Sequence, residues 1–156
     1  MSTLLALAAA TVFGTAAACE PGAGGTAALV TVHGFKDREG QLRIVIYPAN
    51  DADFLAGGRY VQRIDVPLTP AGDMTVCAPV PAAGELIVVA LHDRDRNGKF
   101  SAFRDGVGFS RNPKLGLSKP KIAAVAVQLD GVTPMRIELN YLQGLTVAPV
   151  RARQTR

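Results

Sequence analysis

The sequence has few of the residues that catalytic and zinc sites usually require. It contains two cysteines and two histidines, His33 and His92, which we expect on different strands. A zinc site commonly takes about four ligands from these residue types and carboxylates, so a zinc centre is not expected. The chain has no Gly-x-Ser-x-Gly elbow, and Gly106-x-Gly108 lacks the third glycine of a phosphate-binding loop. These absences argue against zinc, nucleophile-elbow and nucleotide chemistry.

Hydrophobic runs long enough to span a membrane are also absent. The most apolar segment, 4–13, is too short to cross a bilayer as a helix. It is followed by Ala16-x-Ala18, which is typical of a secretory signal and its cleavage site, although no lysine or arginine precedes the run. We therefore expect residues 1–18 to be a signal peptide and the protein to be periplasmic or secreted.

The interpretation of the two cysteines depends on that compartment. In an oxidising environment Cys19 and Cys77 are expected to form a disulfide that closes a long loop. The alternative is a lipid on Cys19, directly after the expected cleavage site, which would make the protein a membrane-anchored lipoprotein. Ala16 stands where lipoprotein signals usually have leucine, so the disulfide is preferred. The two interpretations exclude each other because a lipidated Cys19 cannot pair.

Charge is sparse overall and concentrated in one segment. The net charge is +4, and residues 93–121 contain eight basic and three acidic side chains. Aromatic residues do not interleave with these cations as they do on nucleic-acid-binding surfaces, and export also argues against nucleic acid as a partner. We expect no nucleic acid, and a membrane only if Cys19 is lipidated. A solvated basic loop is the plain alternative to a binding role.

Short apolar runs separated by glycine, proline and aspartate dominate the rest of the chain. Hydrophobic residues make up 48% of the sequence, enough to build the core of one domain. Seven such runs predict an all-β, seven-stranded antiparallel β-sandwich of immunoglobulin-like or transthyretin-like type, with an open barrel as the alternative. We expect a linker at 19–25, the domain at 26–144 and a basic, disordered tail at 145–156. The expected strands are 27–35, 41–47, 60–68, 73–80, 85–91, 122–129 and 135–142.

One long loop, 92–121, lies between the fifth and sixth expected strands, and loops of this length are usually functional or disordered. Its opening, Asp93-x-Asp95-x-Asn97-Gly98, matches the first half of a calcium loop, in which alternate oxygen ligands converge on the ion. The position of the bidentate acid is Arg104, and the nearest carboxylate is Asp105. Asp93, Asp95, Asn97 and Asp105 are therefore candidate calcium ligands. The alternative is a turn whose side chains cap backbone amides.

Other polar residues of this loop are candidates for anchoring it to the sandwich. His92, Asp93 and Ser110 together offer the residue types of a catalytic triad. Adjacent residues on a strand point to opposite faces, so Asp93 is badly placed to orient His92. We therefore interpret His92 as a hydrogen-bonding anchor at the start of the loop, and we assign Gly98, Ser110 and Asn112 the same anchoring role.

Three motifs carry a resemblance to a known family. They are His92-Asp93-x-Asp95-x-Asn97-Gly98-Lys99, then Asp105-Gly106-x-Gly108-Phe109-Ser110-x-Asn112, and the ending Leu139-Asn140-Tyr141-Leu142. Together they resemble a family of exported bacterial proteins known only as domain of unknown function 2141, over roughly Ala27 to Gly144. The resemblance implies a secreted or periplasmic β-sandwich-like domain with no established activity, and it supplies no catalytic residues.

These observations favour a non-catalytic exported module that binds an unknown ligand or envelope component through the 92–121 loop, with calcium as a candidate ligand of that loop. A hydrolase-type enzyme using His92 and the loop acids is one alternative. A purely structural, lipid-anchored envelope protein is another.

Overall fold

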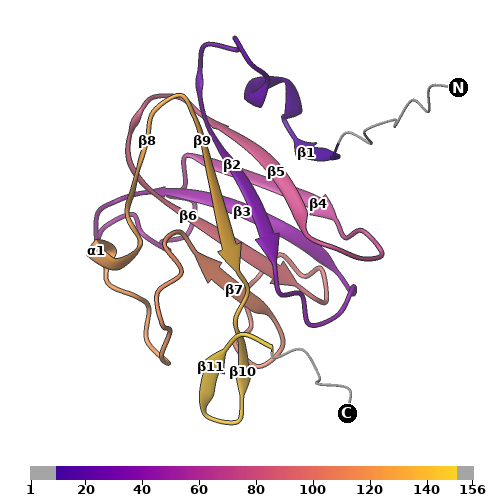
Figure 1. The fold of residues 1–156 in the computed structure, drawn as a ribbon. Helices are drawn as coiled ribbons and strands as arrows, with labels where there is room; N and C mark the ends of the chain where they lie inside the picture. Colours follow the sequence, from indigo (N-terminus) through magenta and orange to yellow (C-terminus); the bar gives the residue numbers. More distant parts are fainter. Residues whose placement is uncertain (1–9, 151–156) are drawn as a thin grey trace, which may run out of the picture.

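The computed structural model describes residues 10–150, so most of the expected signal segment and residues 151–156 of the expected tail lie outside the described part. Its strands form two main sheets, of order β1-β5-β2-β9 and β4-β3-β6-β7, with β8 paired to β6 and a separate hairpin of β10 and β11 (Figure 1). The strands are β1 (Val12–Gly14), β2 (Thr26–His33), β3 (Gln41–Pro48), β4 (Gln62–Pro67), β5 (Met74–Val80), β6 (Gly84–Asp93), β7 (Gly106–Phe109), β8 (Val127–Leu129), β9 (Val132–Glu138), β10 (Tyr141–Gln143) and β11 (Thr146–Ala148), with a 3₁₀ turn η1 (Ala16–Cys19) and one helical turn α1 (Ile122–Val125).

The core lies between the two sheets and follows from alternation along the strands. In β3, Leu42, Ile44 and Ile46 are fully buried and pack against residues such as Val30 of β2 and Val76 of β5. Side chains of successive residues leave a strand on opposite faces, so one apolar face per sheet closes the sandwich. The all-β sandwich expected from the sequence is therefore confirmed.

The five-stranded sheet also buries apolar side chains on its outer face. In β6, Ile87 and Val89 point away from the main core and join a second cluster with Phe54, Phe109 and Val125. A strand that is apolar on both faces is a strand covered on both sides. The side chains that cover this outer face include Phe54, from the segment between β3 and β4, and Val125 of α1. The second cluster therefore lies on the outer side of the five-stranded sheet, beneath these segments.

Strand direction and element type differ from the expectation in several places. β9 pairs with β2 in parallel, and β1 pairs with β5 in parallel, so the sheets are not wholly antiparallel. Residues 122–125, expected to begin a strand, form α1, because a short apolar run fits a buried helical turn as well as a strand. The expected strand 135–142 is divided into β9 and β10. The expected tail contains β11, which pairs with β10, so 145–156 is not a tail throughout.

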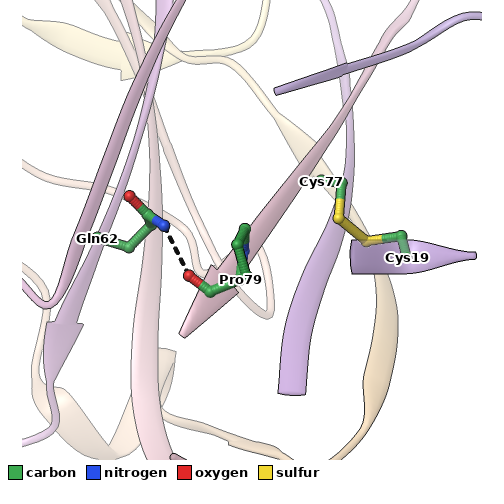
Figure 2. Close-up of a disulfide and its surroundings, with 4 residues drawn as sticks. All are labelled: Cys19, Gln62, Cys77 and Pro79. Carbon is green, nitrogen blue, oxygen red and sulfur yellow. Dashed lines mark hydrogen bonds between the residues drawn. A yellow bond between two sulfur atoms is a disulfide. The ribbon is translucent and has the colours of Figure 1, made fainter. Parts of the chain in front are cut away.

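The N-terminal segment is joined to the four-stranded sheet by a disulfide. Cys19 at the end of η1 is bonded to Cys77 of β5, with the two Cα atoms 6.0 Å apart (Figure 2), which confirms the expected pairing. The Cys19 sulfur in this disulfide cannot also carry a lipid. In the same view, the side-chain amide of Gln62, the first residue of β4, donates to the carbonyl oxygen of Pro79 in β5 at 2.7 Å (Figure 2).

The expected signal segment also contributes a strand. Phe13 of β1 packs against the main core. Cleavage after Ala18 stays a prediction; it would remove β1 and leave both cysteines in the chain. Within residues 10–150, no helix is both long and apolar enough to span a membrane.

Candidate functional site

An open cavity of about 680 Å³ lies on the outer face of the five-stranded sheet. Val45 of β3, Leu91 of β6, and Val107 and Phe109 of β7 form its floor. In β3, Val45 and Tyr47 lie on the face opposite to the buried Ile44 and Ile46, which is why an apolar floor forms outside the main core. The arrangement is a concave, mainly apolar surface supported by a rigid sheet.

Loops and the C-terminal hairpin form the walls of the cavity. They come from residues 55–60, 98–105 and 115–120, and from the β10–β11 hairpin, which projects beside β7 in Figure 1. Part of the expected 92–121 loop is a strand. Residues 106–109 form β7, which pairs with β6 and contributes to the floor of the cavity. The remainder of the loop bounds the cavity, together with segments far away in the sequence.

Glycines allow β7 to take this place. A Cβ atom added to Gly106 would lie 2.5 Å from the ring of Tyr141, and one added to Gly108 would lie 2.5 Å from the carbonyl oxygen of Glu138. Glycine is uncommon in strands unless another group approaches the backbone closely, as happens here. The sequence expectation missed β7 because both of these residues disfavour a strand when the neighbours are unknown.

The mouth of the cavity is bordered by exposed apolar side chains. Of the nine large hydrophobic residues exposed among residues 10–150, six line this cavity. The most exposed are Phe103 (91%), Leu145 (87%), Leu117 (73%) and Phe100 (51%). Scattered apolar residues are normal on a protein surface, whereas here most of the large exposed ones gather around one hollow.

An ion pair between the buried Arg43 and Asp65 at the surface fixes one wall of the cavity to the sheet. The Arg43 guanidinium donates to both carboxylate oxygens of Asp65, at 2.6 and 3.0 Å, and to the Gly98 carbonyl oxygen at 2.8 Å. The hydrogen bond with Asp65 raises the pKa of Arg43, and the same bond lowers the pKa of the Asp65 carboxyl group. Arg43 therefore stays charged and holds the loop at Gly98, whose φ of +75° favours glycine.

Three of the candidate calcium ligands lie together at the base of the loop. Carboxylate oxygens of Asp93, Asp95 and Asp105 lie within 4.8 Å of one another. Asp93 is only 4% exposed; its Oδ2 accepts from the Gly98 amide at 2.9 Å and from Gln41, while its Oδ1 has no hydrogen-bond partner among the described residues.

The same side chains also cap backbone amides of the loop. Asp105 accepts from the Arg94 and Ser101 amides, at 3.0 and 2.8 Å. Asn97 accepts from the Lys99 amide at 2.8 Å. The capping described by the plain interpretation of this motif is therefore present, and the unpaired oxygen of Asp93 is the feature that capping leaves unexplained.

His92 is wholly buried between the loop base and β10. Its Nδ1 lies 2.6 Å from the Tyr141 hydroxyl, and its Nε2 lies 2.6 Å from the Glu39 carbonyl oxygen. A carbonyl can only accept, so Nε2 carries the proton and Nδ1 accepts from Tyr141, which in turn accepts from the Lys36 amide. Burial lowers the pKa of His92 and raises that of Tyr141 to about 12, in keeping with a neutral pair. Both ring nitrogens are thus engaged away from solvent.

The remaining anchor candidates contact separate parts of the sandwich. The buried Ser110 hydroxyl accepts from the Val88 amide and donates to the Val125 carbonyl oxygen. The Asn112 side chain donates to the Arg136 carbonyl oxygen and accepts from the Glu138 amide, both at 2.9 Å. Ser110 directly follows β7, and Asn112 lies two residues further along the chain, so both contacts lie beyond the strand that forms part of the cavity floor.

Sequence reasoning identified the loop but missed the cavity. Arg43 and Leu91, which line the cavity, were not predicted as site residues, and neither was Tyr141, the hydrogen-bond partner of His92. These contacts depend on which strands pair, which the sequence did not show. Two signals were available: the second face of β3, where Val45 and Tyr47 are apolar at positions that a solvent-exposed strand face would fill with polar residues, and the apolar run 86–91, which indicates a strand covered on both faces.

Comparison with known proteins gives one family match. A model of the bacterial family described as "Uncharacterized protein conserved in bacteria (DUF2141)" matches residues 30–137, which is more than half of the chain. No curated protein and no solved structure matches the chain.

Proposed function

The chain belongs to the bacterial family DUF2141, for which the family description gives no activity, and from the geometry of its cavity we propose that it is a non-catalytic binding module for an apolar small molecule. The cavity of about 680 Å³ is the observation that carries the proposal. Small-molecule sites are usually concave, mainly apolar and between about 300 and 1,000 Å³. An exported location, as the N-terminal segment predicts, is part of the same proposal.

The position of the cavity supports binding more than catalysis. Its floor consists of Val45, Leu91, Val107 and Phe109, which offer shape and apolar contact but no nucleophile or base. His92, the residue on which a hydrolase would depend, is buried and has both nitrogens bonded to protein groups. The apolar floor and the engaged nitrogens of His92 therefore favour a ligand that is held and released over one that is transformed.

Binding of an uncharged naphthylamine dye tests the proposal. We expect the wild-type protein to bind the dye saturably with one site, seen as an increase in dye fluorescence. Leu91→Glu places a carboxylate on the half-buried floor, and burying it beside an apolar ligand should weaken binding at least about tenfold, equivalent to about 1.4 kcal/mol.

Val132→Glu is the matched control, because Val132 is an exposed residue of β9 away from the cavity. We expect it to bind the dye like the wild type. Equal loss of binding in the two variants, or none in Leu91→Glu, would contradict the assignment of the cavity as the binding site.

A calcium ion at the base of the loop is a second element of the proposal. Asp93 Oδ1 is a buried carboxylate oxygen with no hydrogen-bond partner among residues 10–150, and such an oxygen costs free energy unless a donor or cation satisfies it. Asp95 and Asp105 bring further oxygens within 4.8 Å, and Ca²⁺ takes oxygen ligands. Arg104 already donates to Asp95, so the ion would compete with a guanidinium and bind in the weaker range typical of extracellular modules.

Thermal unfolding with calcium and with chelator tests this site. At a calcium concentration of about ten times Kd, binding should stabilise the fold by about 1.4 kcal/mol and raise Tm by about 3–5 °C. Asp95→Asn should abolish the shift without unfolding the chain, because Asp95 is exposed. Asp130→Asn, at an exposed position in the turn before β9, should keep it. Wild-type unfolding curves that coincide in calcium and in chelator would contradict the calcium site.

A further inference from the structure

We propose that the mouth of the cavity docks on an anionic lipid bilayer, so that the apolar ligand passes between membrane and cavity without crossing water. The ligand part of this inference rests on the proposed function, while the docking itself rests on the surface around the mouth. The contact needs no lipid on Cys19, because it uses loop side chains on the outer side of the five-stranded sheet.

Apolar tips from three separate segments surround the mouth. Phe103 belongs to the 98–105 wall, Leu117 to the 115–120 wall, and Leu145 to the turn between β10 and β11. All three line the same cavity and are largely exposed, so they border one opening rather than being scattered over the surface. Exposed phenylalanine and leucine side chains insert favourably into the boundary between lipid headgroups and acyl chains.

The charge of the same loop complements an anionic surface. Its three acids are already occupied: Asp93 and Asp105 are buried and bonded to backbone amides, and Asp95 pairs with Arg104. Much of the basic charge of the loop, by contrast, faces no acidic partner. Among residues 10–150, the basic side chains of this segment without an ion pair are Arg96, Lys99, Arg111, Lys114, Lys119 and Lys121.

The positions of these cations relate them to the apolar tips. Lys99 is adjacent in sequence to Phe100, Lys119 itself lines the cavity, and Lys114 is three residues before Leu117. Each cation near an anionic membrane surface adds to the attraction between the protein and the membrane. Apolar insertion and electrostatic attraction would thus act on the same face of the protein.

An anionic bilayer fits this face better than a second copy of the chain does. Two copies joined through their mouths would bring the same unpaired cations against each other, and like charges across an interface oppose association. A bilayer containing anionic lipid supplies both the apolar phase and the opposite charge. It is also a reservoir of molecules that a mainly apolar cavity of this volume can accommodate.

Sedimentation with vesicles tests the docking. The full-length protein is mixed with vesicles of phosphatidylcholine alone and with vesicles that also contain phosphatidylglycerol, at low and high salt. We expect at least tenfold tighter binding to the anionic vesicles, reduced by salt because the attraction between exposed charges is screened. Phe103→Ser combined with Leu117→Ser should weaken that binding by a further tenfold or more.

Val61→Ser combined with Val132→Ser is the matched control, since both valines are exposed and lie outside the cavity. It should bind vesicles like the wild type. Equal binding to the two kinds of vesicle, or equal loss in the two double variants, would overturn the docking. So would a concentration-dependent dimer in sedimentation velocity that accounts for the patch without any vesicle binding.

The dye titration keeps the two proposals separate. A protein that binds the dye in solution but neither kind of vesicle retains the cavity function and loses the membrane contact. A protein that binds anionic vesicles but not the dye retains the contact and loses the ligand proposal.

Discussion

Cys19→Ala is expected to lower the free energy of unfolding by about 4 kcal/mol. The disulfide joins residues 58 positions apart, so removing it frees a long loop in the unfolded chain and raises the entropy of that state. Cys77 stays in the core strand β5 as a buried thiol, which is an acceptable core residue, so no cavity forms there. The expected loss applies equally to a chain cleaved after Ala18, because that chain keeps both cysteines.

Urea unfolding of the wild type and of Cys19→Ala, each with and without reductant, measures this effect. Reductant should destabilise the wild type by the same amount as Cys19→Ala does, and it should leave Cys19→Ala unchanged. A wild type whose urea midpoint does not respond to reductant, while Cys19→Ala is strongly destabilised, would show that the residue matters for a reason other than the crosslink.

His92→Ala is expected to cost about 3–5 kcal/mol of stability. The variant empties a fully buried volume and leaves the Tyr141 hydroxyl and the Glu39 carbonyl oxygen without their partner. Tyr141→Phe removes a single hydroxyl from the same chain of hydrogen bonds and should cost about 1–3 kcal/mol. The double variant should cost less than the two losses added, because both act on one interaction.

His33→Ala is the control for this comparison. His33 is the other histidine, half-buried, and pairs with Glu138 at 3.1 Å near the surface, so its removal should cost below about 1 kcal/mol. Urea midpoints and m-values of the wild type and the four variants give the comparison. A His92→Ala protein as stable as the wild type that had lost a hydrolytic activity would reverse our interpretation and favour the enzyme.

The sandwich could be predicted because its signals are local. The alternation of Leu42, Ile44 and Ile46 with Arg43, Val45 and Tyr47 marks β3 as a strand with one face in the core, and the nearly unbroken apolar run of β6 marks a strand covered on both faces. The direction in which neighbouring strands pair could not be predicted from local sequence patterns. The parallel pairing of β9 with β2 depends on the chain crossing from β8 in one sheet to β9 in the other, and both strand directions show the same alternation of side chains.

The site could be predicted only in part for the same reason. The spacing of Asp93, Asp95 and Asp105 indicated acids that could meet, and the structure brings their oxygens together. The cavity needs β3, β6, β7 and the β10–β11 hairpin side by side, and β7 exists only because Gly106 and Gly108 admit Tyr141 and Glu138 at close range. No pattern within the 92–121 loop encodes those distant neighbours.

We propose binding of an apolar ligand on the outer face of the five-stranded sheet. Backbone amide shifts of ¹⁵N-labelled protein, followed during titration with the naphthylamine dye, test it most directly. We expect saturable shifts at Val45, Leu91, Val107 and Phe109, with the amides of β2 and β5 in the opposite sheet unchanged. Shifts confined to the opposite sheet, or no shifts at dye concentrations that saturate fluorescence, would contradict it.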